Sequence, residues 1–304
     1  MKWEKLGLVY CAANDSSWAY SHAHVPTPLL RTDNTIRVFV AFLDSAQIGR
    51  IGYVDVDAAD PTRVLRVSAQ PVLDIGADGM FDDNGVIPMC VVSFEDKLYL
   101  FYTGWQLGHK VRYCLLTGLA LSQDQGETFS RVSPVPVLER AEGETFVRST
   151  PSIIRCGSQW KMWYIAGDKW IDDGGTKKPS YGLRYQESSS LTVWKNRGRP
   201  VFDPGTDDEF GLSRPCVYME KTQYRMIYSV RSRSAGYRLG YAESEDGLHW
   251  LRKDEEIGID VSKSGWDSEM LCFGTVIGVG KKRYLFYNGN HYGKSGFGVA
   301  VLSV

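Results

Sequence analysis

The chain has 304 residues, of which 43% are hydrophobic and 23% are charged, and its formal net charge is -1. This balance is typical of a folded globular protein and excludes an intrinsically disordered chain. A charge this close to neutral also excludes the basic excess that binding to a nucleic-acid backbone requires.

The sequence contains no run of the roughly 18 to 20 apolar residues that a membrane span needs. The N-terminal residues Met1 to Lys5 lack the apolar core of a signal peptide. We therefore expect a cytoplasmic protein without a membrane partner. The six cysteines are far apart and form no CxxC pair, which predicts buried free thiols and no metal site or other cofactor.

In chain order, five segments each open with a residue that starts a strand and leads into an apolar run. We expect these first strands to begin at Pro28, Pro88, Pro151, Pro215 and Thr275. Successive starts are 60, 63, 64 and 60 residues apart, which indicates five copies of one structural unit.

Each unit continues with a second run, rich in aromatic and β-branched residues, that favours a strand. These second runs are 38–42, 98–102, 161–164, 225–228 and 284–287. The third runs, which usually open with glycine, are 52–54, 118–121, 182–185, 240–242 and 298–300. Turns rich in Asp and Gly at 122–129 and 244–250 then predict a short outer fourth strand.

Four antiparallel strands per unit form the blade of a β-propeller. We therefore predict an all-β, five-bladed β-propeller that forms a single domain over residues 1–304. The last unit ends after its third strand, so we expect the N-terminal strand at Trp3 to Leu6 to complete blade five. The polar insertion 168–180 is expected to be a loop over the pocket mouth.

Residues just before the first strands are expected to meet at one mouth of a central channel, because innermost strands surround the axis of a propeller. Four units carry an acid at a similar distance before the start, and the first carries a histidine. These residues are His22, Asp82 with Asp83, Glu144, Glu209 and Glu269. Carboxylates held close together shift one another's pKa, so one can donate a proton while another accepts one. We therefore expect Glu209, Asp83, Glu144 and Glu269 to be catalytic.

Arginines and loop aromatics lie near the same mouth. A ring of acids and arginines is costly to bury unless it is paired or holds a polar ligand. Tryptophan and tyrosine in loops, beside polar residues, suit stacking against a sugar. The expected substrate-binding residues are His22, His24, Asp82, Arg148, Arg214, Arg231, Trp105, Trp170, Trp266, Asp267, Asn290, His291 and Tyr292.

The runs 209–215, 241–250, 265–269 and 287–293 resemble the five-bladed glycoside hydrolase superfamily. That superfamily includes the arabinanase-like family 43, the invertase-like family 32 and the mannoside phosphorylases of family 130, and the resemblance covers essentially the whole chain. It implies that an acid of blade one is the general base and that a later acid is the general acid. An acid of a middle blade, the tuning acid, then adjusts the pKa and the orientation of the general acid. By position, Glu209 matches the general acid, and Asp83 or Glu144 matches the tuning acid.

Blade one departs from this pattern, because residues 21–26 contain His22 and His24 but no acid where the base belongs. In the phosphorylases of the superfamily a phosphate attacks the sugar, and arginines and histidines suit such an anion. The same groups suit an anion carried by the substrate itself, since arginine offers two parallel donors to a carboxylate or phosphate.

The leading prediction is a carbohydrate-active enzyme that cleaves or transfers a glycosyl group. We expect its substrate to be a small glycoside or an intermediate of polysaccharide biosynthesis, and its partner a small-molecule carbohydrate, anionic or phosphorylated. A glycoside phosphorylase and a non-catalytic propeller that binds a glycan or a sugar nucleotide are the alternatives. The sequence leaves the oligomeric state open.

Overall fold

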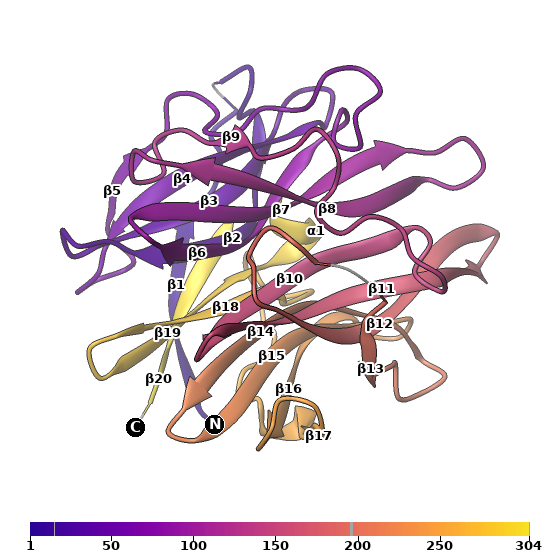
Figure 1. Ribbon diagram of the computed structural model, residues 1–304. Helices are drawn as coiled ribbons and strands as arrows, with labels where there is room; N and C mark the ends of the chain where they lie inside the picture. The colour runs from indigo at the N-terminus through magenta and orange to yellow at the C-terminus, as the bar shows by residue number, and fades with distance from the viewer. Residues whose placement is uncertain (15, 195–196, 304) are drawn as a thin grey trace.

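The computed structural model describes residues 1–14, 16–194 and 197–303, so Val304, the last residue of the predicted domain, lies outside the described residues. The described chain is almost entirely β-strand (Figure 1). Its strands pair in chain order as five antiparallel groups of four.

The bounds of the strands follow the predicted units. Group one contains β2 (Ser21–Leu30), β3 (Thr35–Leu43), β4 (Gly49–Asp57) and β5 (Val64–Val67), and group two contains β6 (Val86–Phe94), β7 (Lys97–Leu107), β8 (Tyr113–Ser122) and β9 (Ser130–Arg131). Group three contains β10 (Val147–Cys156), β11 (Gln159–Asp173), β12 (Thr176–Ser188) and β13 (Arg199–Phe202), and group four contains β14 (Glu209–Glu220), β15 (Gln223–Ser232), β16 (Gly236–Ser244) and β17 (Leu251–Arg252). Group five contains β18 (Cys272–Val279), β19 (Lys282–Asn288), β20 (Phe297–Leu302) and β1 (Trp3–Tyr10). Two short helices, η1 (Asp254–Glu256) and α1 (Asn290–Gly293), complete the described elements.

The N-terminal strand belongs to the last group. β1 pairs antiparallel with β20, with Trp3 opposite Leu302, and the order of strands in this sheet is β1-β20-β19-β18. This confirms the prediction that the N-terminus supplies the missing fourth strand. The two ends of the chain are thereby held side by side in one sheet (Figure 1).

The hydrophobic core is divided among the contacts between neighbouring groups. Buried side chains of groups one and two share one cluster, as Phe39 and Leu100 illustrate, and a second cluster joins groups two and three through Phe101 and Met162. Two further clusters join groups three and four and groups four and five. A fifth joins group five back to group one, through Phe286 and Val38. Since each second strand is covered on both faces, its central residues are mostly apolar, as in 38–42, 98–102 and 284–287.

The first strands of the five groups surround a common centre. They contact one another in a closed cycle, β2 with β6, β6 with β10, β10 with β14, β14 with β18, and β18 with β2. The buried guanidinium of Arg214 on β14 donates hydrogen bonds to Thr27 Oγ1 at 2.8 Å, to Thr275 Oγ1 at 3.0 Å and to the Met89 carbonyl. One side chain therefore touches first strands of three other groups. Hydrogen bonds join the described strands into three sheets, none of which closes on itself.

All five first strands begin before the predicted residues, at Ser21, Val86, Val147, Glu209 and Cys272. Bulges in these strands also show that two of the predicted starts are misaligned within the repeat. In groups three and four the extra residues are Thr150 with Pro151 and Arg214 with Pro215, and Thr150 and Arg214 both have a φ of 51°. In group one the corresponding residues are 25 and 26, and in group five they are 273 and 274, so the repeat aligns on Pro26 and Gly274 instead of Pro28 and Thr275. Proline suits this position because a bulge leaves one residue without a ladder partner, and proline has no N–H to satisfy.

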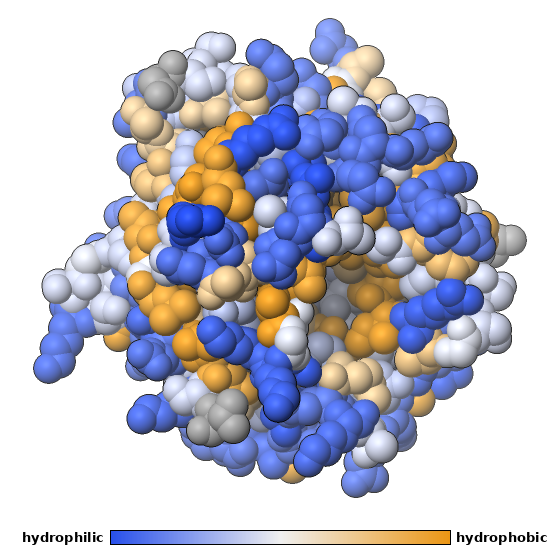
Figure 2. Space-filling model, turned by 90° about the vertical axis from the view of Figure 1, so that its left-hand side faces the viewer, coloured by the Kyte–Doolittle hydropathy of each residue, from blue (hydrophilic) through white to orange (hydrophobic). Residues whose placement is uncertain are grey.

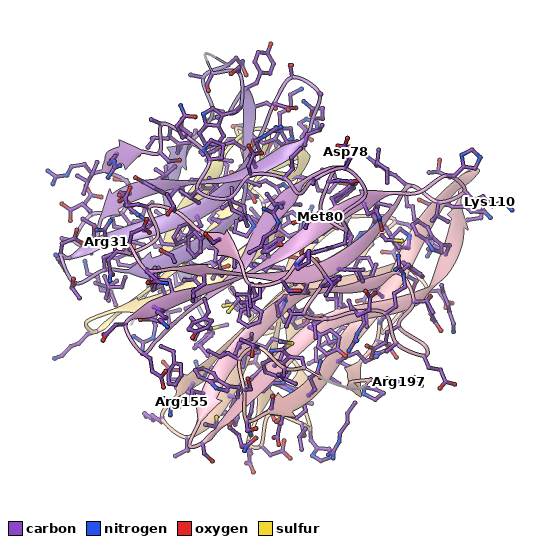
Figure 3. The ribbon with its side chains drawn as sticks, turned by 45° about the horizontal axis from the view of Figure 1, so that its top comes forward. Arg31, Asp78, Met80, Lys110, Arg155 and Arg197 are labelled. Atoms are coloured by element: carbon purple, nitrogen blue, oxygen red, sulfur yellow. The ribbon has the colours of Figure 1, made fainter. Side chains whose placement is uncertain are left out.

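The two ends of the first strands lie on opposite faces of the molecule. Figure 3 places Arg31 and Arg155, which lie at the far ends of the first strands of groups one and three, on the left. Lys110, at the tip of the β7–β8 hairpin, lies on the right, and we call this right-hand face, where the first strands begin, the mouth. Figure 2 shows the face opposite the mouth, with one hollow whose walls include hydrophobic residues.

Residues 168–180 do not form the predicted loop. They continue β11 and β12 as a paired hairpin, with Asp173 opposite Thr176 and the turn at Gly174 and Gly175. The strand-favouring Trp170 and Ile171 extend the ladder, and the two glycines supply the left-handed turn. Across the three described ranges, no helix is long and apolar enough to span a membrane.

Candidate functional site

The acid that recurs before the first strands is bonded to a tyrosine of the second strand. In group two, Asp82 is fully buried. Its Oδ2 accepts hydrogen bonds from the Tyr102 hydroxyl at 2.9 Å and from Arg131 Nε at 2.8 Å. The set joins the loop before β6 to β7 and β9, so it stabilises the group from within.

The same arrangement recurs in groups three and five. Glu144 is fully buried, accepts from the Tyr164 hydroxyl at 2.8 Å and lies 2.7 Å from Arg148 Nε. In group five the acid is Asp267, not the predicted Glu269. We call these sets the acid–tyrosine triads: Asp82 with Tyr102 and Arg131, Glu144 with Tyr164 and Arg148, and Asp267 with Tyr287 and Lys5.

Among its described residues, group one lacks the acid and the tyrosine of a triad. Val40, opposite the bulge at Val25 and Pro26, takes the place that Tyr164 and Tyr287 occupy in groups three and five. It packs with Phe42 in the apolar cluster shared with group five. The missing acid of group one therefore coincides with a missing structural tyrosine, and packing explains why the acid is absent.

Glu209 is held by a bidentate ion pair. Its Oε1 and Oε2 accept from Arg252 Nη2 at 2.9 Å and Nη1 at 3.0 Å, and Oε2 also accepts from the Gly205 N–H at 2.7 Å. Burial raises the pKa of Glu209, but the bonds from Arg252 and Gly205 outweigh it and hold the pKa below its usual value. A general acid needs a raised pKa, so this geometry opposes the proton-donor role that the family resemblance implies.

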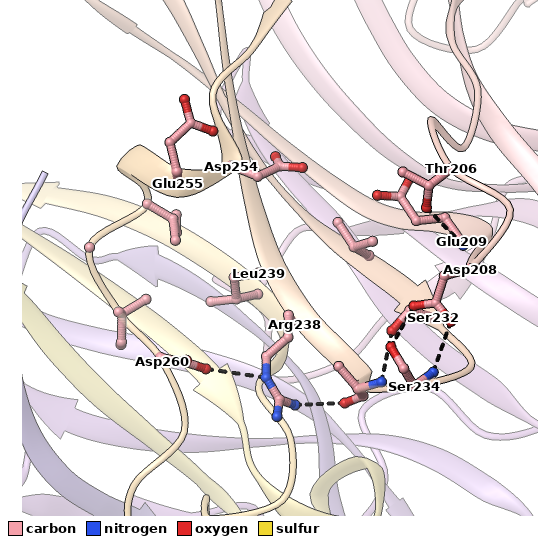
Figure 4. Close-up of a pocket in the computed structure, with 15 residues that line it drawn as sticks. Thr206, Asp208, Glu209, Ser232, Ser234, Arg238, Leu239, Asp254, Glu255 and Asp260 are labelled. Atoms are coloured by element: carbon pink, nitrogen blue, oxygen red, sulfur yellow. Dashed lines mark hydrogen bonds and ion pairs between the residues drawn. The ribbon is translucent and has the colours of Figure 1, made fainter.

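Glu209 lines a cavity of about 690 Å³ that is bounded by β15, β16, η1 and residues 257–260 (Figure 4). Other acids around it are also engaged, since Asp208 accepts from the Ser234 N–H at 3.0 Å and Asp260 lies 3.2 Å from Arg238. No described residue that lines the cavity is aromatic. The cavity therefore offers no ring on which a sugar would stack.

Aromatic side chains gather instead at the mouth. Ring centroids lie 4.3 Å apart for Trp105 and Tyr113, 5.9 Å for Tyr113 and Trp170, and 5.4 Å for Tyr237 and Tyr292. We call the whole set the aromatic belt: Trp105, Tyr113, Phe146, Trp170, Tyr181, Phe210, Tyr237, Phe273 and Tyr292. It contains residues of groups two to five, and His24 of group one packs against Phe273 at 4.9 Å.

Arg231 lies within this belt with 9% of its surface exposed. Its guanidinium carbon is 4.5 Å from the ring centroid of Phe210, 5.0 Å from Tyr181 and 5.6 Å from Tyr237. Nη1 donates to the Tyr181 hydroxyl. Among the described residues no carboxylate forms an ion pair with Arg231, so this buried cation is without a counter-charge.

His22 and His24 enter the mouth from β2. His22 Nδ1 lies 2.9 Å from Ser21 Oγ, and His24 Nδ1 contacts the Tyr292 carbonyl. The pKa of both rings is lowered to about 4, mainly by burial, and for His22 also by the nearby charge of Lys294. Both histidines are therefore neutral at pH 7 and act as hydrogen-bonding groups.

These pKa values predict a loss of stability in mild acid. The unfolded chain binds a proton near the ordinary histidine pKa of 6.5, whereas folded His24 binds one only near pH 4. The stabilising contribution is thus complete above about pH 6.5 and lost as the pH falls toward 4. In urea unfolding at pH 7, 5.5 and 4.5, the free energy of unfolding should fall less with decreasing pH for His24→Gln than for the wild type. A control variant of the exposed His109, His109→Gln, should keep the wild-type loss, and equal losses in all three proteins would contradict the assignment.

The segment that carries Tyr292 is strained and firmly held. His291 and Tyr292 have left-handed φ values of 55° and 60°. Asn290 Oδ1 accepts from the Glu269 N–H at 2.8 Å, and Asn288 Oδ1 accepts from the Val25 N–H at 2.7 Å. Strain of this kind persists where the surroundings fix it, and it is common at binding sites.

The predicted site residues therefore divide into two sets. The structure brings His22, His24, Trp105, Trp170, Arg231, Glu269, His291 and Tyr292 to the mouth. It uses Asp82, Glu144, Arg148, Glu209, Arg214, Asp267 and Asn290 for contacts within and between the groups. Trp266 belongs to the second set, because it stacks on Tyr287 at 5.2 Å and fits against Gly298, where a Cβ would lie 2.4 Å from its ring.

Asp83 lies beside the belt. Its neighbours Asn84 and Gly85 bond to the backbone of Trp105, at 3.1 and 2.9 Å. Asp83 Oδ2 accepts from the Gly79 N–H at 2.9 Å, and within the described ranges the carboxylate has no other hydrogen bond or ion pair. This acid is therefore available to a ligand.

Several belt residues escaped the sequence analysis. Tyr113, Tyr181, Phe210, Tyr237 and Phe273 stand in or beside apolar runs, where core packing is the usual role of an aromatic. Tyr113 and Tyr237 each begin or nearly begin a third strand, next to a hairpin turn. That position on the mouth side of a repeat is the signal that could have found them.

Solved structures with similar folds are glycoside-processing proteins. A structure of a BT0996 complex with RGII matches with a TM-score of 0.78 and 18% identity, over 99% of this chain and 92% of that protein. A structure described under the GH130 family of mannoside phosphorylases, which contains glycoside hydrolases that target β-1,2 mannosidic linkages in Candida mannan, has a TM-score of 0.75 and 17% identity over 99% and 93%. A thermostable family-43 glycoside hydrolase has a TM-score of 0.70 and 16% identity over 94% and 91%. The protein thus shares the fold of these solved structures.

Two relatives in Mycobacterium tuberculosis are similar along their whole length. They are the uncharacterized proteins MT1551 of strain CDC 1551 / Oshkosh, 36% identical over 302 residues, and Rv1502 of strain ATCC 25618 / H37Rv, 35% identical over 302 residues. Each alignment covers 99% of this chain and 99% of the relative, so the chain belongs to the family of these two proteins. No protein-family model matches it.

Proposed function

We propose that this protein binds a negatively charged glycoside at the mouth and cleaves or transfers its glycosyl group. The observation that carries the proposal is Arg231, a buried cation without a carboxylate partner among the described residues, set among aromatic rings. A bound carboxylate or phosphate would supply the missing counter-charge, and the rings suit the apolar face of a sugar. The fold shared with glycoside hydrolases supports this class of substrate.

We propose that the five groups are the five blades of one propeller. The closed cycle of contacts between first strands supports this arrangement, as do the five hydrophobic clusters between neighbouring groups. Arg214, which reaches three other first strands, then lies on the axis below the mouth.

Asp83 and Glu269 are the proposed catalytic carboxylates. One Asp83 oxygen has no partner among the described residues, and the backbone of the next two residues bonds to Trp105. The Glu269 side chain is 59% exposed, with Oε2 3.7 Å from His291 Nε2. Either can exchange a proton with a bound glycoside or with water. In this proposal Glu144 and Glu209 stabilise the fold and take no part in catalysis.

The proposed setting is the cytoplasm, with a small glycoside or an intermediate of polysaccharide biosynthesis as substrate. All six cysteines are free, and free thiols are typical of reducing compartments. A phosphorolytic reaction fits the same site, because Arg231 would hold inorganic phosphate as well as it would hold a substrate's own anion.

A non-catalytic binding propeller is the second candidate. The lowered pKa of Glu209 favours it, because the residue that matches the general acid by position is locked in an ion pair. Calorimetric titration of glycosides, uronides and sugar phosphates, with product analysis of each ligand bound, separates the candidates. Binding without any product would favour the second.

Asp83→Asn is expected to reduce turnover at least about 100-fold without changing the melting temperature, because general acid–base groups contribute at least that much. Asparagine keeps the acceptor for the Gly79 N–H. Initial rates and thermal unfolding of the purified variant provide the measurement.

Glu209→Gln is the matched comparison. It should lower the melting temperature while the rate per folded molecule stays near the wild-type value, because it weakens the ion pair with Arg252. The reverse pattern, in which Glu209→Gln abolishes turnover and Asp83→Asn does not, would return the proton-donor role to Glu209.

A further inference from the structure

A strip of three aromatic residues leads from the mouth onto two projecting hairpins. Trp105 and Tyr113 lie on the β7–β8 hairpin, and Trp170 lies on the β11–β12 hairpin. The two hairpins project on the same side of the molecule (Figure 1). The ring centroids are 4.3 Å apart for Trp105 and Tyr113 and 5.9 Å apart for Tyr113 and Trp170, so the strip is continuous.

The strip is connected to the charged centre of the mouth. Trp170 packs on Phe146 at 4.8 Å. The Tyr113 phenol lies within electrostatic range of Arg231 and of Tyr181. A long ligand whose charged group reaches Arg231 would therefore extend toward Tyr113.

Within the described ranges, the polar edges of these rings have no protein partner. The indole N–H of Trp163 donates to a carbonyl at 2.8 Å, and that of Trp194 also at 2.8 Å. Among the described residues, Trp105 Nε1, Trp170 Nε1 and the Tyr113 hydroxyl make no such bond. All three side chains are half-buried, so these groups are accessible to a ligand. Amphipathic rings with a free donor at the edge suit a ligand that offers both an apolar face and hydroxyl groups.

The strip continues into exposed apolar surface. Leu107, at the end of β7, is 61% exposed. The charged residues near the strip are of both signs, since Lys110 and Arg112 lie between β7 and β8, and Asp168 and Asp172 flank Trp170 on β11. Aromatic surface of this kind, continuous with a binding site, indicates a longer ligand.

We propose that the substrate is an oligosaccharide whose anionic sugar sits at Arg231 and whose neutral sugars lie along Trp105, Tyr113 and Trp170. This inference rests on the proposed function and specifies its substrate class. The anionic sugar supplies the charge, and each neutral ring adds stacking area and hydroxyl groups that accept from the free indole N–H groups. A monosaccharide would leave the strip uncovered.

The test is a titration series in which only the neutral part grows. Glucuronic acid, galacturonic acid and N-acetylneuraminic acid are each titrated free, linked to one neutral hexose and linked to two. For at least one acid, the first added hexose should raise affinity about tenfold, because burying roughly 60 Å² of apolar surface contributes about 1.4 kcal/mol. Trp105→Ala and Trp170→Ala should remove this gain and leave the affinity for the free acid unchanged.

Two controls guard against misfolding. Trp105→Phe keeps a ring and should retain most of the gain, and Leu251→Ala, at an exposed residue of an outer strand, should retain all of it. Affinity that does not depend on length, or a gain that survives in both alanine variants, would overturn this inference while leaving the proposed function intact. Failure of every acid to bind would overturn the proposed function as well.

Discussion

Glu144→Ala is expected to lower the free energy of unfolding by about 3 to 5 kcal/mol, because removing one member of a buried ion pair leaves an uncompensated charge. Glu144 is fully buried, lies 2.7 Å from Arg148 Nε and accepts from the Tyr164 hydroxyl at 2.8 Å and the Gly198 N–H at 3.1 Å. Urea unfolding at pH 7 measures the change.

The comparison variant is Glu142→Ala, which changes an exposed acid two residues away. It should stay within about 0.5 kcal/mol of the wild type, as surface substitutions usually do. If Glu144→Ala unfolded with the wild-type free energy, the acid–tyrosine triads would not be structural. The repeated acids would then again be candidates for catalysis.

Arg231→Met is expected to weaken binding of anionic glycosides by about 30-fold or more. Truncating one partner of a buried, hydrogen-bonded charge pair costs at least about 2 kcal/mol, and each 1.4 kcal/mol is a factor of ten in affinity. Binding of an uncharged glycoside should change little, because the rings of Phe210 and Tyr237 remain. Calorimetry of a charged and an uncharged ligand of the same sugar gives the two affinities.

Arg233→Met serves as the control for Arg231. Arg233 follows on the same strand end, but its side chain is 41% exposed and lies 3.7 Å from Asp173. Arg233→Met should change the affinity for either ligand only slightly, because an exposed charge contributes little to binding. Equal losses in the two variants, or equal losses for charged and uncharged ligands, would show that Arg231 does not hold the anion.

The fold was accessible from the sequence because a repeat leaves the same apolar pattern in every copy. The alternation of runs after Pro88, Pro151 and Pro215 matched the strands closely. Blade one was misaligned because it contains two prolines, Pro26 and Pro28, and only the backbone bulge decides between them. The pairing of β1 with β20 was predictable because the last unit lacked a fourth strand.

The site was harder to predict because an acid at the same distance before a first strand can be either structural or catalytic. Asp82 and Glu144 recur for a structural reason, the bond to a second-strand tyrosine, and a sequence pattern does not separate this role from catalysis. Arg231 was predicted from its position at a strand end, and Trp105 and Trp170 were predicted from their polar neighbours, although both lie within strands, β7 and β11. Tyr113 and Tyr237 were missed because most of the 17 tyrosines fill the core between groups.

A crystal structure of the protein with a bound anionic glycoside is the most direct test of the proposed site. The account predicts a carboxylate or phosphate oxygen within hydrogen-bonding distance of the Arg231 guanidinium, with sugar rings against the belt near Tyr237 and Tyr292. A ligand bound instead in the cavity beside Glu209, with the mouth empty, would contradict it.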